Sequence, residues 1–531
     1  MALSIISNRL PPGDTPVCGV PLEPYVLCRR DNGITATADE IPEESAGNAS
    51  GARYVLRYRC TSCLRQHWAW HKELHEQRRA QNGQLENGYR DDGVPKMGAT
   101  FSNGGETWEE VSRSRQYTPT TDDVGSMLKN EVTALDTASA FPELGKPFAV
   151  ATARVRPAPQ PPKRSLVELK PSAPVGPTRF TALTYNLLAD LYATMTAGQH
   201  THAQPWMLAW GYRKQNLLKE LIVYQADILC LQEVQSNHFL DFLAPKLQEA
   251  GYSAIYKKKT TEIYAGNAYA IDGCATFFRR DRFALVKKYE VEFNKAALSL
   301  SEALSSEQRQ SALNRLLKDN VALIAVLEAL DTPEKQSGSG SRRQLICVAN
   351  THIHANPELS DVKLWQVHTL LKGLEKIAAS ADIPMLVAGD FNSVPGSAAH
   401  SLLVNNSVDS GHPELQNDPL GILRPAHKLR HNLPLASAYA AVADGRDLAP
   451  AAQRLRQRMD PRHREPKFTS MSKNFKGTLD YILYTSDSLV PTAALDLPED
   501  SEVSTPEGGP GGQTARNRPA QEESRPPFTG S

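Results

Sequence analysis

Cysteine is scarce in this sequence, which has seven cysteines spread over 531 residues. A sparse set with an odd number does not resemble the disulfide framework of a secreted protein. No stretch approaches the roughly 20 apolar residues that are needed to cross a bilayer. The first residues also lack the basic flank and the apolar run of a secretory signal. These absences predict a soluble protein of the cytoplasm and the nucleus, with no membrane partner.

An excess of charge of either sign is also missing, because 59 basic and 59 acidic residues cancel. A zero total neither supports nor excludes nucleic acid, since binding needs a local basic groove and not a basic total. The chain is longer than one ordinary core can organise, so two or three domains are expected.

Changes in composition divide the chain into four parts. Residues 1–154 hold short β-type runs separated by turn residues, which predict a small β-rich domain. Residues 155–177 are rich in proline, which favours an extended linker. Residues 178–495 alternate apolar strand-like runs with helical patterns. Residues 496–531 have almost nothing apolar to bury, so we expect a disordered tail.

The third part predicts a layered α/β core or a sandwich core, with helices outside it. Its strand-like runs read RFTALTY, DILCLQEV, CATFFRR, VALIAVLEAL, LICVANTH and PMLVAGDF. One amphipathic helix is predicted at 206–224, with an apolar face made of Leu217, Leu218, Leu221 and Ile222. A second is predicted from the spacing of Leu364, Leu370, Leu371, Leu374 and Ile377.

Polar residues stand at or near the ends of these strand-like runs. They are Asn186, Glu233, Asp272, His352, Asp390, Asn392 and Asp480. A single acidic residue after a strand is usually a turn residue or a helix cap. Several at the same position relative to their strands are harder to explain that way, because a rigid scaffold presents such side chains to one cleft. Carboxylate and amide oxygens are hard ligands suited to Mg²⁺, and with histidine donors they supply what phosphodiester hydrolysis needs.

The motifs TYNLLAD, LQEV, NTHIH, GDFNSVPGS and GTLDYILYT, in this order, resemble the endonuclease/exonuclease/phosphatase superfamily. Within it, DGCATFFRRDRF and KFTSMSKNFKGTLDYILYT are similar to carbon-catabolite-repressor-four-type deadenylases, the plant and green-algal branch in particular. The resemblance covers about residues 178–490. It implies an α+β fold, a two-layered β-sandwich flanked by helices, with a divalent-metal cleft at one rim. It also implies a 3′-to-5′ poly(A)-specific exoribonuclease that releases AMP.

The resemblance also implies roles for the polar positions. Glu233 matches the principal Mg²⁺ ligand, with Asn186 beside it. Asp390 and Asn392 match a pair that orients the attacking water and binds a second metal ion. His352 matches a histidine that donates to the scissile phosphate. One or two Mg²⁺ ions are implied, with Mn²⁺ as an alternative.

The remaining positions complete the implied cleft. Asp272 and Asp480 match acidic residues that line it, and we count them with the candidate catalytic residues. Pro357 and Phe475 match a pair that sandwiches adenine, and Asn294 is assigned to the substrate with them. Stacking on one base contributes about 1–3 kcal/mol. The implied partners are single-stranded poly(A) RNA and other subunits of a deadenylase complex.

One element of that family is missing. The family closes with a Ser-Asp-His element on its last strand, beyond GTLDY, whereas the last histidine here is His463 and no Ser-Asp-His follows Asp500. Losing a general base commonly costs on the order of 10²–10⁴ in rate, and losing the last strand would expose a sheet edge. Two interpretations stay open: a truncated or misread C-terminus, or a nuclease that is impaired.

A remnant of a zinc finger is a further expectation. The segment from Cys60 to Glu76 resembles part of a MYND-like finger inserted at about residues 60–80. Cys60, Cys63 and His71, with His67 or His75, have the chemistry of Zn²⁺ ligands. The earlier cysteine pairs of that finger are absent, so an exposed helix is the competing interpretation.

Two other functions compete with deadenylation. One is another phosphoesterase of the superfamily, such as an apurinic endonuclease, an inositol phosphatase or a nocturnin-like phosphatase. The other is a scaffold in a deadenylase complex without catalysis of its own, which the missing histidine favours.

Overall fold

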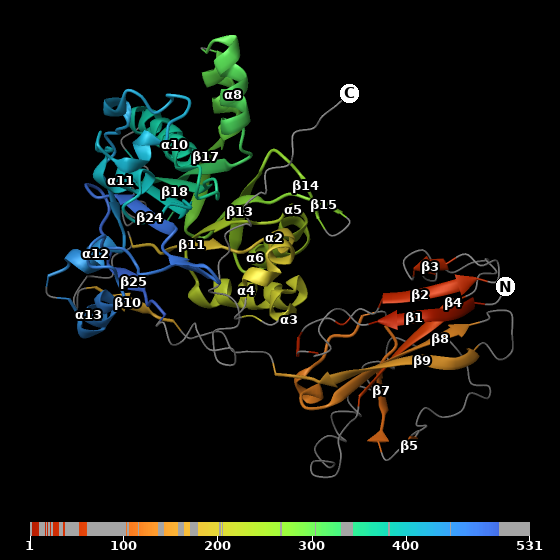
Figure 1. The fold of residues 1–531 in the computed structure, drawn as a ribbon. Helices are drawn as coiled ribbons and strands as arrows, with labels where there is room; N and C mark the ends of the chain where they lie inside the picture. Colours follow the sequence, from red (N-terminus) through yellow and green to blue (C-terminus); the bar gives the residue numbers. More distant parts are fainter. Residues whose placement is uncertain are drawn as a thin grey trace. The chain divides into compact units, whose positions relative to one another are not determined.

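The computed structural model describes residues 179–498 apart from 201–202, 204, 266–267, 303, 331–343, 381–382 and 447, together with 164–169 and parts of 3–157. The chain divides into two compact units, Met1–Pro159 and Gln160–Ser531 (Figure 1). No helix in the described ranges is long and apolar enough to cross a membrane.

The first unit contains two principal sheets. A three-stranded antiparallel sheet has the order β1-β2-β3 and a four-stranded one has the order β7-β4-β8-β9. The strands are β1 Leu3–Arg9, β2 Tyr25–Arg30, β3 Thr35–Thr37, β4 Arg53–Cys60, β7 Glu109–Ser112, β8 Met127–Leu135 and β9 Glu143–Arg154. The expected zinc-finger remnant lies outside the described residues, except that Cys60 is the last residue of β4. Zinc binding therefore stays a prediction.

The second unit is built on two facing sheets. A four-stranded sheet has the order β11-β12-β16-β13, and a six-stranded sheet has the order β17-β18-β19-β20-β24-β21. The strands of the smaller sheet are β11 Ala182–Asn186, β12 Ile228–Gln232, β16 Gly273–Arg279 and β13 Tyr252–Lys258. Those of the larger are β17 Phe283–Glu292, β18 Val321–Ala329, β19 Leu345–His352, β20 Met385–Asp390, β24 Asp480–Thr485 and β21 Leu435–Ser437.

Strand alternation builds both the core between the sheets and the two cores beneath the helices. In β12, Ile228 and Cys230 pack toward the other sheet, whereas Leu229 and Leu231 pack toward the helices. A strand that is apolar at every position is therefore buried on both faces.

Helices cover the outer face of each sheet. Helices α4 (Trp210–Tyr224) and α6 (Ala244–Glu249) cover the smaller sheet, and α7 (Phe293–Glu302), α10 (Ser360–Ser380) and α11 (Ala398–Asn405) cover the larger (Figure 1). The predicted two-layered β-sandwich flanked by helices is confirmed.

The two predicted helices fare differently. The apolar stripe of α10 is confirmed, because its four leucines are buried. The helix expected at 206–224 is two helices, α3 (Pro205–Leu208) and α4, separated at Ala209. Leu217 and Leu221 of α4 are buried, but Ile222 is 40% exposed. Neighbours in a helix point about 100° apart, so Ile222 was wrongly placed on the same face as Leu221.

The prediction of an extended linker over residues 155–177 is wrong in its central part. Leu166–Glu168 forms strand β10, which pairs with β25 (Ala493–Leu495). Val167 and Leu169 are buried against helices α12 (Ala440–Asp444) and α13 (Pro450–Gln457). The apolar residues between the prolines therefore belong to the second unit.

One edge of the smaller sheet is formed by β11. Within the described residues β11 is one of the two end strands of that sheet and pairs with β12 alone. A groove of about 1170 Å³ runs beside it and reaches residues that pack on the core between the sheets, among them Phe180, Ala182, Ile482 and Tyr484. The sandwich is thus open along β11.

Candidate active site

The topology gathers the predicted polar residues at one rim of the sandwich. Strands β11 and β12 run parallel, as do β19 and β20, so the carboxyl ends of each pair lie side by side. Strands β16 and β24 run antiparallel to these neighbours and therefore begin at the same rim. The residues at these positions are Asn186, Glu233, Asp272, His352, Asp390, Asn392 and Asp480.

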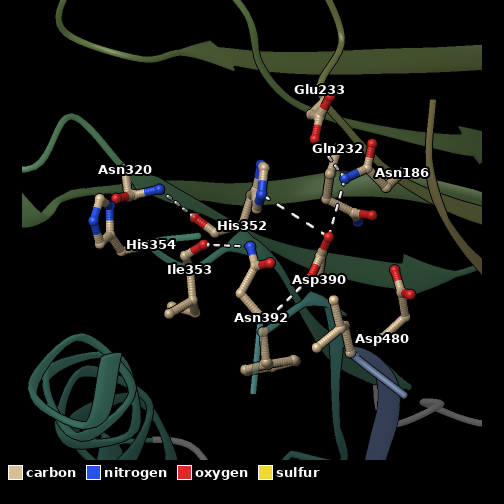
Figure 2. Close-up of polar contacts among 12 residues, drawn as sticks. Asn186, Gln232, Glu233, Asn320, His352, Ile353, His354, Asp390, Asn392 and Asp480 are labelled. Carbon is tan, nitrogen blue, oxygen red and sulfur yellow. Dashed lines mark hydrogen bonds and ion pairs between the residues drawn. The ribbon is translucent and has the colours of Figure 1, made fainter. Parts of the chain in front are cut away.

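An amide group joins the two sheets at the centre of the rim. Asn186 Nδ2 donates to Glu233 Oε1 at 2.8 Å and to Asp390 Oδ2 at 3.0 Å (Figure 2). Both carboxylates also accept backbone hydrogen bonds, Glu233 from Ala189 and Asp390 from Asn392. The structure thus brings the predicted metal ligands together. The Asn186 side chain directs its Nδ2 toward the two carboxylates, because its Oδ1 accepts a hydrogen bond from the Leu188 N–H. Metal ligation by Asn186 would require the amide to turn over.

His352 lies beside this centre. Its Nε2 is 3.9 Å from Asp390 Oδ2 (Figure 2), and the ring is 4% exposed. Neither ring nitrogen has a hydrogen-bond partner among the described residues. Burial, followed by the charges of Lys259 and His354, lowers the pKa of His352 well below its usual range. A neutral, buried imidazole with no protein partner is suited to bind a polar group of the substrate.

Asn392 is fixed by hydrogen bonds of both its side chain and its backbone. Its Nδ2 donates to the Ile353 carbonyl at 2.8 Å (Figure 2), and its own carbonyl accepts from Lys363 Nζ at 2.7 Å. Its Oδ1 is buried and has no partner in the described part of the chain. That oxygen is therefore available as a ligand.

Two rim residues have unusual backbone geometry. Glu233 has φ of 51° and Asn392 has φ of 48°, values that side chains with a Cβ rarely adopt. Such strain is typical of functional sites, where the surrounding structure enforces it. Gly389, next to Asp390, is needed for a related reason, because a Cβ there would lie 2.0 Å from the Thr351 carbonyl oxygen.

In the described part of the chain, no lysine or arginine forms an ion pair with either carboxylate at the centre. Burial, and then the negative charge of Asp272, raises the pKa of Glu233 to about 7. Burial, and then Asp480, raises the pKa of Asp390 to about 8. Two neighbouring carboxylates with raised pKa values would be stabilised in their ionised form by a bound cation.

The donor set fits Mg²⁺. In the described ranges, no three His, Cys, Asp or Glu residues come together as a ready metal site. Mg²⁺ does not need such a cage, since it often binds through one or two carboxylates and keeps several waters. Glu233, Asp390 and the free Oδ1 of Asn392 offer hard oxygen ligands at this place.

The outer candidate residues lie in different settings. Asp480 is the first residue of β24 and accepts a 2.6 Å hydrogen bond from Thr469 Oγ1. Phe475 begins the short strand β23 (Phe475–Gly477), and Pro357 is exposed in the turn after β19. Asn294, in α7, donates to Thr260 Oγ1 at 2.9 Å. Adenine stacking by Pro357 and Phe475 stays a prediction.

Several residues of the rim were missed from the sequence. Gln232 Nε2 donates to Asn350 Oδ1 at 2.8 Å, so two fully buried amides connect the sheets beneath the site. Each amide stands inside an apolar run, one or two residues before a candidate site residue. That position in the sequence could have identified both. Lys259, Tyr192 and Thr469 were missed as well, and only their tertiary contacts identify them.

Comparisons with known proteins agree with this fold. The model of the Endonuclease/Exonuclease/phosphatase family matches residues 183–502. "Carbon catabolite repressor protein 4 homolog 1" of Arabidopsis thaliana is 43% identical over 578 aligned residues, which cover 94% of each chain. "CCR4-Not complex 3'-5'-exoribonuclease subunit Ccr4" of Yarrowia lipolytica is 32% identical over 58% of this chain and 42% of its own length.

The rim of polar residues on a helix-flanked sandwich defines a protein of the endonuclease/exonuclease/phosphatase class, and the chain belongs to that family. Within the family it is a member of the carbon-catabolite-repressor-four-type deadenylases, since the Arabidopsis relatives match nearly its whole length. Among solved structures, "Crystal structure of ANGEL2, a 2',3'-cyclic phosphatase" matches 66% of this chain and 95% of its own, with 25% identity and a TM-score of 0.49.

Proposed function

We propose that this chain is a Mg²⁺-dependent 3′-to-5′ exoribonuclease that shortens poly(A) tails and releases AMP. The observation that carries the proposal is the bridge of Asn186 to Glu233 and Asp390, with the unpartnered His352 ring beside it. Relatives named as 3'-5' exoribonuclease subunits support it.

Each group at the rim has a task in this proposal. Glu233, Asp390 and Asn392 Oδ1 would hold the ion, which neutralises phosphate charge and activates a water for attack. His352 stays neutral near pH 7 because of its lowered pKa, so one ring nitrogen donates and the other accepts. We assign its N–H to a phosphate oxygen, where it stabilises developing negative charge.

The wider setting is proposed from the relatives. Several of them are named as subunits of a CCR4-Not complex, and we propose that this chain also acts with other subunits of a deadenylase complex. The location in cytoplasm and nucleus stays a prediction.

The primary test is a gel assay of the purified full chain on RNA with a labelled 5′ end and a 3′ oligo(A) tail. We expect stepwise shortening of the adenine tail with Mg²⁺, none with EDTA, and little on a control tail without adenine. The matched variant is Glu233→Ala. Equal activity of this variant and the parent chain would sink the proposal.

A second function, that of a scaffold without catalysis, is favoured by one observation: the open groove beside β11 in a chain that lacks a C-terminal Ser-Asp-His. Appending an apolar strand that carries Ser-Asp-His separates the two functions. A gain on the order of 10²-fold or more over the parent chain would indicate a nuclease that lacks one catalytic group. No activity in either protein would leave the scaffold as the function.

A further inference from the structure

A lysine, a tyrosine and an aspartate form a buried cluster at the rim, next to the carboxylates described above. Lys259 directly follows β13 and Asp272 directly precedes β16, and the antiparallel register pairs Lys258 with Gly273. The Lys259 N–H also donates to the Asp272 carbonyl at 2.8 Å. Tyr192 comes from helix α2 (Asp190–Met195). Side chains from three distant segments are thus brought together by the fold.

Both side-chain contacts to Asp272 in this cluster end on the same carboxylate oxygen. Lys259 Nζ lies 3.1 Å from Asp272 Oδ1, and the Tyr192 hydroxyl donates to the same oxygen at 3.0 Å. Lys259 Nζ also donates to the Tyr192 hydroxyl at 3.0 Å. The other oxygen, Asp272 Oδ2, is buried and has no hydrogen-bond partner in the described ranges. Asp272 is therefore held through one carboxylate oxygen, while the other is buried without a hydrogen-bond donor among the described residues.

This asymmetry differs from that of an ordinary structural ion pair. A buried ion pair contributes to stability only when hydrogen bonds satisfy its remaining lone pairs. Asp272 is 1% exposed and Lys259 is 7% exposed, so water does not satisfy them freely. A buried acceptor left without a donor costs free energy, and it persists where function requires it.

Other charged groups also face Asp272. Asp319 adds negative charge, and burial is the main cause of a raised pKa of Asp272 despite the neighbouring Lys259. Asp272 in turn raises the pKa of Glu233 and of Tyr256. Lys259 opposes the effect of burial on the pKa of Asp272 more than any other group, through both its charge and its hydrogen bond.

We propose that Lys259 and Tyr192 are positioning residues that hold Asp272 by one oxygen, so that its second oxygen accepts a hydrogen bond in the reacting site. The proposal rests on the proposed nuclease function, since the donor to that oxygen arrives when substrate is bound. It assigns no direct contact between Lys259 and the RNA.

The experiment is a double-mutant cycle in the full chain, with Lys259→Met, Asp272→Asn and the pair combined. Steady-state kinetics on oligo(A) RNA with Mg²⁺ are measured from pH 6 to pH 9. We expect Lys259→Met to lower kcat by about 10²-fold, with KM changed less than about twofold. The remaining activity should move to higher pH, because Asp272 without its cation ionises later. The double variant should be no slower than Asp272→Asn alone.

Two conservative variants sharpen the cycle. Lys259→Arg keeps the cation and should restore most of the activity, and Tyr192→Phe removes one donor and should cost about 10-fold. Unchanged kcat and pH profile in Lys259→Met, with only a lower unfolding midpoint, would mean a purely structural ion pair and overturn the proposal. A raised KM in Lys259→Met, together with a loss of kcat/KM in the combined variant that equals the sum of the two single losses, would indicate a direct contact between Lys259 and RNA. That result would overturn the proposal too.

The unfolding midpoint does not depend on catalysis, so it tests this inference separately from the proposed nuclease function. An inactive parent chain in the same assay means that the proposed function has failed. The unfolding midpoints of the same variants then test the clamp alone. At pH 7 to 9 we expect the combined variant to be more stable than Lys259→Met, because it removes the uncompensated carboxylate. Equal midpoints would show that Lys259 does not compensate Asp272.

Discussion

Asp272 and Asp390 are buried carboxylates at the same rim, and the protein treats them in opposite ways. Lys259 Nζ lies 3.1 Å from Asp272 Oδ1. Asp390 instead accepts a hydrogen bond from the Asn186 amide and has the His352 ring 3.9 Å away. Burial raises the pKa of both, and next to Asp480 that of Asp390 reaches about 8. Lys259 thus compensates the charge of Asp272, whereas no lysine or arginine of the described residues forms an ion pair with Asp390.

Removal of a central carboxylate should have the largest effect on activity. We expect Glu233→Gln or Asp390→Asn to reduce oligo(A) shortening by more than about 10²-fold, because the metal ion loses a ligand. Initial rates at saturating Mg²⁺ measure this. Glu220→Gln is the matched control, since Glu220 is a buried carboxylate held by Tyr185 away from the rim. An equally large loss of activity in Glu220→Gln would show that Glu233 and Asp390 are no more important for activity than another buried carboxylate.

The stability effects of the two aspartates should have opposite signs. Asp272→Asn leaves Lys259 buried and unpaired, which should lower the free energy of unfolding by about 3–5 kcal/mol. Asp390→Asn should raise it, without metal, by on the order of 1–3 kcal/mol at pH 7, because burial and then Asp480 raise the pKa of Asp390 to about 8 and folding therefore requires its protonation. Urea unfolding in EDTA measures both. A similar destabilisation by both variants would contradict the comparison.

Magnesium and pH should act together on the central pair. Glu233 and Asp390 have pKa values raised to about 7 and about 8, whereas in the unfolded chain they ionise near pH 4. The folded state therefore holds more protons between these values, so metal-free stability should fall as pH rises from about 4 to 8. Mg²⁺ binds the ionised form, so its affinity should rise over the same range and level off above it.

Thermal unfolding against Mg²⁺ concentration, at several pH values, tests this coupling. Asp390→Asn should flatten most of the dependence, and Asp272→Asn should leave it largely in place. A Mg²⁺ stabilisation that is independent of pH in the parent chain would argue against binding at these carboxylates.

The smallest effect is expected at Asp480, which lies next to the central pair. Thr469 Oγ1 donates to its carboxylate at 2.6 Å and accepts from the backbone N–H groups of Leu479 and Asp480. Thr469→Val keeps the shape and removes these bonds, so we expect about a 10-fold loss of activity. Thr469→Ser should retain most of it. Equal rates for the valine and serine variants would exclude a role of the hydroxyl.

Much of the fold was predictable because its signals are local. Apolar runs of strand length and the leucine spacing of α10 give burial directly. The errors came from packing over long range. Residues 164–169 looked like linker, yet they pair with β25, more than 320 positions later in the chain. Ala209 divides a predicted helix, and no strong breaker in the sequence marks that place.

The sequence predicted which residues form the site better than it predicted how they contact one another. The rim residues follow strand ends, so they were found as a set, and the structure does bring Asn186, Glu233 and Asp390 into contact. The orientation of the Asn186 amide, which donates to both carboxylates, could not be read from the chain. Neither could the clamp of Lys259 and Tyr192 on Asp272, because these residues have no common spacing.

The sequence by itself determined the two sheets, the family and the chemical types of the site residues, because strand periodicity and the order of short motifs are properties of neighbours along the chain. The tertiary structure decided which carboxylate has a cation and which has none. It also decided that β11, among the described strands, lies at one edge of its sheet beside a groove. The reason is physical: charge compensation and burial depend on distances between segments that are far apart in sequence, and only the packed sandwich sets those distances.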